Sequence, residues 1–208
     1  MTKQIKVGNV KIGGGAPISI QSMAKTDTRD ILATVRQIKE LEGAGCEIIR
    51  VAIKDFEAAK AIRAIKRKIN LPLVADIHFD YRLALLSIEN GADKIRLNPG
   101  NIYKEDEIRE VVMAAKKRRI PIRVGANSGS IRLKAEGSRL KAEDIVKPVL
   151  DYIKILEKMD FYDIIVSLKA SNVLSTIEAY KLFSKKSKYP VHLGVTAAGP
   201  VSTGIVKS

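Results

Sequence analysis

Four cationic side chains lie within or at the end of apolar runs of this sequence, and their chemistry indicates an anion site. Arg50, Arg96, Arg123 and Lys169 each belong to a stretch rich in Ile, Val and Leu. A guanidinium group is planar and can donate two parallel hydrogen bonds to phosphate oxygens. Buried cations without matching carboxylates are costly unless an anion joins them. The pattern predicts a pocket for a phosphorylated ligand, and a diphosphate fits the charge.

Acidic and neutral polar side chains fall at matching places. Asp76 and His78 alternate at the end of one apolar run, and Asn98 and Asn127 end two others. Further hydrogen-bonding residues stand at alternate positions in or just after the last two runs, from which their side chains would point to the same face. They are Ser167, Ser171, His192 and Thr196. A lone histidine at a strand end is more often structural than an acid or base. Asp76 and His78 are nevertheless the catalytic candidates of this sequence.

A purely structural role for the arginines is the competing interpretation. Arg50, Arg96 and Arg123 can be interior residues of the fold. Asp76 and Glu47 would then neutralise them as buried ion pairs. This interpretation can explain any one of the arginines, but not all of them together. Few acidic residues stand at alternating positions from which their side chains would point the same way as the arginines. The excess of positive charge favours the anion pocket.

Alternating short apolar runs and longer amphipathic segments must position these side chains. The predicted strands are Ile18–Met23, Glu47–Ala52, Leu71–Phe79, Lys94–Asn98, Ile120–Gly125, Asp163–Ser167 and Tyr189–Val195. Between them, apolar residues recur at three- and four-residue spacing, which is typical of amphipathic helices. Strict alternation of strand and helix predicts right-handed crossovers and a parallel sheet. A polar segment at 128–144 is expected to form a surface loop or small hairpin after the fifth strand.

The architecture that fits best is an α/β fold of the TIM type, a (β/α)8 barrel that is incomplete here with about seven βα units. We expect a single domain over 1–208 that ends in the helix after the seventh strand. A doubly wound open sheet is the alternative, but its glycine-rich phosphate turn does not follow the first strand. Residues 13–15 are all glycine, precede that strand and are expected to form an amino-terminal turn. In a parallel barrel the carboxyl ends of the strands converge on one mouth, which is where such folds carry chemistry.

Composition limits the classes of partner and compartment. The 37 Lys and Arg residues against 23 Asp and Glu give a net charge of +14, which suits anionic partners. Aromatic residues make up 5% and Trp is absent, so a nucleic-acid surface is disfavoured. With no long apolar run and no signal sequence, we expect a cytoplasmic protein without membrane contact. Cys46 is the one cysteine, is expected to be a buried filler and cannot alone hold zinc or an iron–sulfur cluster.

Several strings of the sequence resemble one enzyme family. They are ADIHFDYR at 75–82, KIRLNPGN at 94–101 and RVGANSGS at 123–130. Shorter matches are QSM at 21–23, TDT at 26–28, SLKAS at 167–171 and HLGVT at 192–196. In this order they closely resemble the 4-hydroxy-3-methylbut-2-enyl diphosphate (HMBPP) synthases that depend on flavodoxin or ferredoxin, from about residue 6 to 208.

The resemblance implies a reductive ring opening of 2-C-methyl-D-erythritol 2,4-cyclodiphosphate in the non-mevalonate (MEP) isoprenoid pathway. It implies a [4Fe-4S] cluster, a flavodoxin or ferredoxin as electron donor, and a homodimer. By motif, Arg50, Arg96, Arg123 and Lys169 correspond to a phosphate clamp, with Asn98 and Asn127 as hydrogen-bonding partners. Asp76 and His78 correspond to residues of the substrate cavity.

The sequence departs from the family pattern in two places. The family's cluster ligands lie on a separate carboxyl-terminal iron–sulfur domain, which is not recognised here, and the strand-seven motif has Ala197 where the family has glutamate. We therefore expect this chain alone to bind substrate without turnover. Alternatives are a non-catalytic phosphate-binding or assembly module, a different barrel enzyme resembling dihydropteroate synthase, and, least favoured, nucleic-acid binding. Strand edges left unpaired predict self-association.

Overall fold

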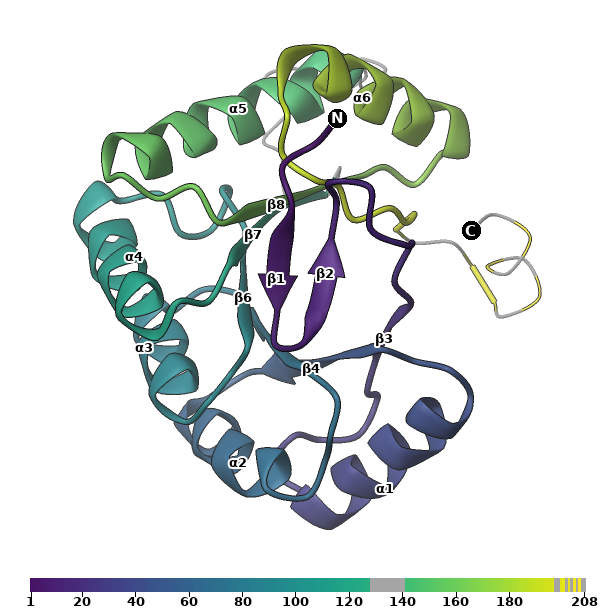
Figure 1. Cartoon of the computed structure of the whole chain (residues 1–208), viewed down its shortest axis with the longest axis vertical. Coiled ribbons are helices and arrows are strands. Elements are labelled where there is room, and N and C mark those ends of the chain that lie inside the picture. The colour runs from purple at the N-terminus through teal and green to yellow at the C-terminus, as the bar shows by residue number, and fades with distance from the viewer. Residues whose placement is uncertain (128–140, 197–198, 201, 203, 205, 207–208) are drawn as a thin grey trace.

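Six parallel strands curl into a partial barrel, and the helices form an arc on its outside (Figure 1). The computed structural model describes residues 1–127, 141–196, 199–200, 202, 204 and 206. The sheet strands are β3 (Gln21–Met23), β4 (Ile48–Ile53), β5 (Leu73–Ile77), β6 (Lys94–Leu97), β7 (Ile122–Asn127) and β8 (Ile164–Lys169). The helices are α1 (Ile31–Gly43), α2 (Phe56–Lys66), α3 (Tyr81–Glu89), α4 (Glu105–Arg118), α5 (Ala142–Lys158) and α6 (Val173–Lys186).

The order of the strands distinguishes the two candidate architectures. In the sheet they run β3-β4-β5-β6-β7-β8, so each strand pairs with its neighbour in sequence. A doubly wound sheet reverses direction at a switch point, whereas a barrel proceeds in one direction. The predicted barrel is therefore confirmed.

Two predicted segments differ from the structure. The seventh predicted strand, Tyr189–Val195, is reduced to a single parallel bridge from Val191 to Val166 of β8. The predicted loop 128–144 extends too far, because α5 already begins at Ala142. There the side chain of Asp144 accepts a hydrogen bond of 2.9 Å from the backbone N–H of Lys141, which fixes the first turn. Residues 128–140 of that segment lie outside the described residues.

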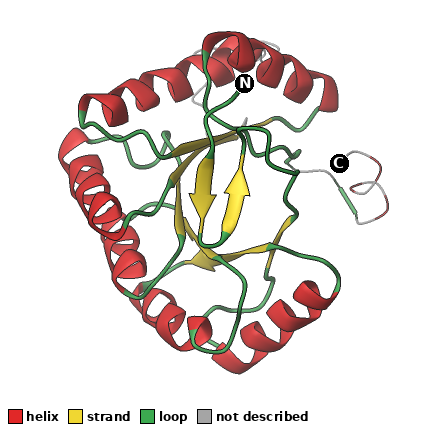
Figure 2. Cartoon of the chain, in the orientation of Figure 1, coloured by secondary structure: helices red, strands yellow, loops and turns green. Residues whose placement is uncertain are grey.

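An amino-terminal hairpin, absent from the sequence-based prediction, lies across the barrel (Figures 1 and 2). Strands β1 (Ile5–Val7) and β2 (Val10–Ile12) pair antiparallel around a two-residue turn. Gly8 opens this turn at φ +56°, a conformation that glycine adopts without strain. The three consecutive glycines also have positive φ, consistent with the predicted turn. Apolar side chains of the hairpin and of three sheet strands form one buried cluster: Ile5, Val7, Ile48, Val74 and Ile165. The hairpin thus closes the end of the barrel where the strands begin.

Helix caps leave the opposite end of the strands free. Asp30, Asp55 and Asp80 each precede a helix and accept a hydrogen bond from its first turn. Asn172 does the same for α6. Such caps satisfy helix N–H groups, and only two or three residues separate α2, α3 and α6 from the preceding strand, so there the chain turns away from the mouth after a short loop. In the described part of the chain, no helix is long and apolar enough to span a bilayer.

Candidate functional site

Three neighbouring strands bring two arginines and one carboxylate together inside the barrel. Asp76 Oδ1 lies 3.3 Å from Nη1 of Arg96, and its Oδ2 lies 3.7 Å from Nε of Arg50. In the sheet, Asp76 is paired in register with Arg96, so both point inward from adjacent strands. Asp76 and Arg96 are buried, and Arg50 is partly exposed. One carboxylate thus holds two guanidinium groups in place.

Arg123 carries the observation that matters most for binding. It lies next to Arg96 in register, on β7, and is 1% exposed. Its Nε and Nη1 atoms are buried and, like Nε of Arg96, have no hydrogen-bond partner among the residues that the structure describes. Burial, reinforced by Arg50, lowers the pKa of Arg123 to about 9. A buried guanidinium with free donors is costly, so this position calls for an anionic partner.

Lys169 adds a cation at the end of β8. Burial, together with repulsion from the neighbouring arginines Arg123, Arg50 and Arg96, lowers its pKa to about 8. Its side chain runs along the backbone at Gly194, where an added Cβ would lie 3.0 Å from Nζ. Lys169 is paired in register with Asn127, the last residue of β7. The mouth therefore gathers four cations, and Asp76 is the carboxylate that the described residues place among them.

Gly125 makes room for this cluster. An added Cβ at this position would lie 2.9 Å from Nε of Arg96 and 2.8 Å from Oγ of Ser167. The Gly125 carbonyl also accepts a hydrogen bond of 3.2 Å from Nη2 of Arg96. Because the φ angle of Gly125 is one that any residue can adopt, the glycine is required for space and not for backbone conformation. In the sequence, only the family-like string around residue 125 indicated that this position matters.

One buried and one partly exposed residue of the interior, Lys94 and His192, were not among the predicted site residues. His192 is surrounded by positive charge, and burial together with Arg123 and Lys169 lowers its pKa far below the usual range. Lys94 begins β6, is fully buried and donates a hydrogen bond of 3.1 Å to Oε1 of Gln21. His192 had been recognised by parity but given no role. Lys94 was missed because the search considered only the last turn of each strand.

The remaining predicted residues take part in the loops above β5 and β6. Asn98 is buried, and its Oδ1 accepts a hydrogen bond of 3.1 Å from the backbone N–H of Gly100. Asn101 Nδ2 donates a bond of 2.7 Å to the carbonyl of His78, which ties the two loops together. The His78 ring lies 6.2 Å from the ring of Phe79. Of the two catalytic candidates, Asp76 is thus inside the cation cluster and His78 follows its strand into the loop. Glu47, offered as a second counter-ion, instead accepts a bond from the backbone of Ile20.

The residues of this chain do not fit an iron–sulfur cluster. Such clusters are held mainly by several cysteine thiolates, and the sequence has only Cys46. That residue is buried, as predicted, and its thiol donates to the carbonyl of Ile48. Across the described ranges, no group of three His, Cys, Asp or Glu side chains is arranged to hold a metal ion.

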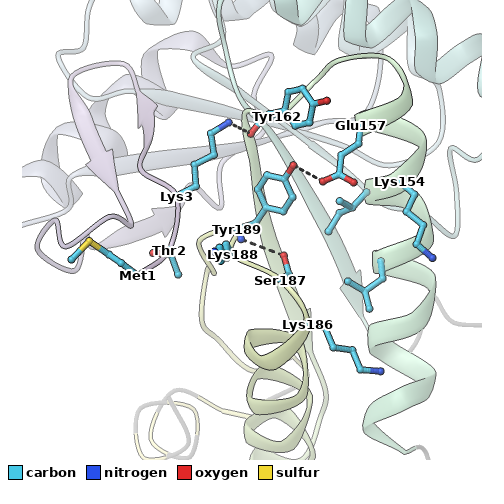
Figure 3. Close-up of a pocket in the computed structure, with 12 residues that line it drawn as sticks. Met1, Thr2, Lys3, Lys154, Glu157, Tyr162, Lys186, Ser187, Lys188 and Tyr189 are labelled. Carbon is cyan, nitrogen blue, oxygen red and sulfur yellow. Dashed lines mark hydrogen bonds between the residues drawn. The ribbon is translucent and has the colours of Figure 1, made fainter.

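A groove of about 570 Å³ lies at the other end of the barrel, between α5, α6 and the amino terminus (Figure 3). Its lysines project toward solvent or are paired. Lys3 donates a bond of 2.8 Å to the carbonyl of Tyr162, and the Tyr189 hydroxyl donates to Glu157. None of the predicted site residues lines this groove. Buried cations without matching acids are therefore a property of the mouth, not of this groove.

The chain matches known proteins over its whole length. It is 58% identical over 211 residues to the 4-hydroxy-3-methylbut-2-en-1-yl diphosphate synthase (flavodoxin) of Caldanaerobacter subterraneus subsp. tengcongensis, covering 100% of this chain and 59% of that protein. The protein of the same name from Thermotoga petrophila is 57% identical over 208 residues, with the same coverage. The chain thus spans about 59% of the length of these curated relatives.

Solved structures support the fold alone. A type I 3-dehydroquinate dehydratase from Clostridium difficile superposes with a TM-score of 0.70 at 17% identity, covering 99% of this chain and 84% of that one. A dihydropteroate synthase from Vibrio fischeri gives a TM-score of 0.61 at 13% identity, with 88% and 72% coverage. The model of the GcpE TIM-barrel domain matches residues 2–208. The chain therefore belongs to the GcpE TIM-barrel domain family.

Proposed function

We propose that this chain is the substrate-binding barrel of an HMBPP synthase and that its mouth binds 2-C-methyl-D-erythritol 2,4-cyclodiphosphate. The observation that carries the proposal is Arg123, a buried guanidinium whose Nε and Nη1 find no hydrogen-bond partner within the described part of the chain. The names of the relatives support the same class of reaction, since they specify formation of an allylic diphosphate. The enzyme would be an oxidoreductase of isoprenoid biosynthesis.

Each cation has a distinct task in this proposal. Asp76 fixes Arg50 and Arg96, so that their outer N–H groups are oriented before the ligand arrives. Arg123 supplies the unsatisfied donors, which a diphosphate oxygen would accept. Lys169, at the rim, adds charge from β8. Because the donors are held rigidly in a buried site, little reorganisation is needed on binding.

The neutral residues would orient the sugar part of the ligand. Asn127 ends β7, the strand of Arg123, and Asn98 directly follows the neighbouring strand β6, so we expect their amides to hydrogen-bond next to the diphosphate. Asp76 and His78 remain the candidates for handling protons, as the family resemblance implies. A two-electron reduction needs a redox group, which the relatives' names connect with flavodoxin as donor. The residues of this chain do not fit that group, and we derive no step through it.

The assembly and location of the enzyme belong to the same proposal. We propose a homodimer in the cytoplasm, in which the redox group, a [4Fe-4S] cluster, is supplied by residues other than those of this barrel. Ala197, the position where the family has glutamate, lies outside the described residues.

Calorimetric titration of the 208-residue chain with the cyclic diphosphate tests the binding proposal. Saturable binding of one ligand per chain is expected at near-physiological salt. Arg123→Met should weaken the affinity roughly 10- to 100-fold, because charged hydrogen bonds are lost from a buried site. Arg109→Met, on the exposed face of α4, is the matched control and should bind as the native chain does. A folded native chain that takes up no ligand would refute the proposal.

A non-catalytic phosphate-binding or assembly module is the second candidate, because the same cluster of cations would serve binding alone. Here the chain binds the diphosphate but no reductant yields product. Mixing the chain with a cluster-bearing polypeptide and reduced flavodoxin discriminates the two. Formation of the allylic diphosphate would exclude the binding-only function.

A further inference from the structure

Lys94 lies one layer below the cations of the mouth. It precedes Arg96 by two residues on β6, so both side chains point into the barrel. Its partner in register on β5 is Val74, which belongs to the apolar cluster under the hairpin. Lys94 is 0% exposed. The amino group of Lys94 therefore lies at the level of the apolar cluster under the hairpin.

The groups that face Lys94 cannot neutralise an ammonium ion. Its hydrogen-bond acceptor is the neutral carboxamide oxygen of Gln21, 3.1 Å away on β3. The titratable and charged groups of the surrounding strands and of the segment after α6 are Arg50, Asp76, Arg96, Arg123, Lys169 and His192. The carboxylate among them, Asp76, already binds Arg50 and Arg96. Burial, with repulsion from Arg123 and Arg50, lowers the pKa of Lys94 far below its usual value.

A diphosphate bound in the mouth would favour the charged form of Lys94. Its negative charges would lie against Arg50, Arg96 and Arg123, and the first and last of these repel a proton from Lys94. An opposite charge within about 4–6 Å favours the charged form of a lysine. In addition, Gln21 can accept a hydrogen bond from either form of the amine, so no rearrangement is needed.

We propose that Lys94 is uncharged when the mouth is empty and takes up a proton when a diphosphate binds above it, so that it becomes the charged floor of the site. This inference rests on the proposed function, because the diphosphate is the source of the charge. The proton comes from solvent and no bond to the ligand is formed. Lys94 is thus a positioning residue that adds attraction only after the ligand is present.

Counting protons during binding tests the proposal on the unaltered chain. The titration with 2-C-methyl-D-erythritol 2,4-cyclodiphosphate is repeated at pH 7 in buffers of different ionisation enthalpy. We expect uptake of about one proton per ligand. Lys169, with a pKa of about 8, is mostly protonated already at this pH and contributes little. Lys94→Met should abolish the uptake, whereas Lys104→Met, at an exposed position, should leave it unchanged.

Two other residues of the mouth could accept the proton: His192, and His78 as a candidate for handling protons. His192→Gln and His78→Gln should each retain the uptake if Lys94 is the acceptor, and its loss in either variant would overturn the proposal. NMR of the native chain with ¹³C-labelled lysine adds a measurement that needs no ligand. One lysine Cε signal should titrate far below the others, and it should be missing from Lys94→Met. If all lysines titrate together, Lys94 is charged in the empty chain and the proposal is wrong.

Failure of this inference can be told from failure of the proposed function. Saturable binding without proton uptake leaves the diphosphate site intact and refutes the role of Lys94. Absence of binding by a folded chain refutes the function, and with it the coupling to Lys94. Should Lys94→Met fold poorly, the double variant with Gln21→Leu removes the unpaired amide as well and serves as its replacement.

Discussion

On β4, Ile48 packs in the apolar cluster under the hairpin, and Arg50, two residues further along the same strand, lies in the charged mouth. The same step leads from Val74 to Asp76 on β5. Side chains two positions apart on a strand point to the same side of the sheet. The interior of the barrel therefore has an apolar end and a cationic end. The apolar end contributes burial and stability. The cationic end costs stability and provides a site for an anion.

β6 departs from this division, because Lys94 occupies the apolar level next to Val74. A stability-optimised barrel would have an aliphatic residue there. On β6, therefore, the proposed change in the charge of Lys94 links the apolar end of the barrel to ligand binding in the mouth. Variants at each end should separate their contributions.

Asp76→Asn should have the largest effect on stability. Removing this carboxylate leaves Arg50 and Arg96 without their counter-ion, and breaking a buried ion pair in this way costs about 3–5 kcal/mol. Urea denaturation measures the loss in free energy of unfolding. The cyclic diphosphate should restore part of it by supplying negative charge. Asp106→Asn, exposed on α4, is the control. Equal stability of both variants would show that the pair is not a structural element of the mouth.

Ile48→Ala should act on the opposite end alone. Ile48 is 1% exposed in the hairpin cluster, and truncation of such a residue typically costs 2–5 kcal/mol. The affinity for the cyclic diphosphate should stay at the native value wherever the variant remains folded. Leu32→Ala, at a residue 69% exposed, should change neither quantity. A large loss of affinity in Ile48→Ala would contradict the separation of the two ends.

The pH dependence should have opposite signs for stability and for binding. The pKa of Lys169 is about 8 in the folded chain, against 10.5 as the ordinary value. Between these values the unfolded chain binds a proton that the folded chain does not, so the free energy of unfolding rises with pH, by roughly 1–3 kcal/mol. Affinity for the diphosphate should fall over the same range, because the lysine loses its charge. Lys169→Met should reduce the slope of both profiles without abolishing it, because Lys94 and Arg123 also have lowered pKa values in the folded chain. Unchanged slopes in this variant would show that Lys169 does not contribute to them.

Gly125→Ala should have the smallest effect, confined to the mouth. The new Cβ would displace the Arg96 side chain, which lies 2.9 Å away. We expect a loss of about 1 kcal/mol in stability and a few-fold weaker binding, since the arginine can shift but not keep its alignment. Gly43→Ala, in α1 with open space around its Cβ, should be neutral or slightly stabilising. Unchanged affinity in Gly125→Ala would show that ligand binding by Arg96 does not depend on the space left at residue 125.

The sequence was sufficient for six of the seven predicted strands, which correspond to β3 to β8. The structure places Arg50, Asp76 and Arg96 side by side, as the period of two in short apolar runs predicts, while their role in binding stays a prediction. The hairpin was missed because three-residue strands are too short to show such a period. The space that Gly125 provides depends on a side chain from β6, 29 residues away, and no local pattern encodes it.

NMR observation of side-chain arginine and backbone signals during one titration tests the division of the barrel most directly. The cyclic diphosphate should shift the Nε–H signals of Arg50, Arg96 and Arg123 at a single saturable affinity. The backbone amides of the hairpin, Val7 and Val10 among them, should stay in place. Shifts that concentrate on the hairpin or on the groove beside Lys3, with the three arginines unmoved, would contradict the assignment of the diphosphate site to the mouth.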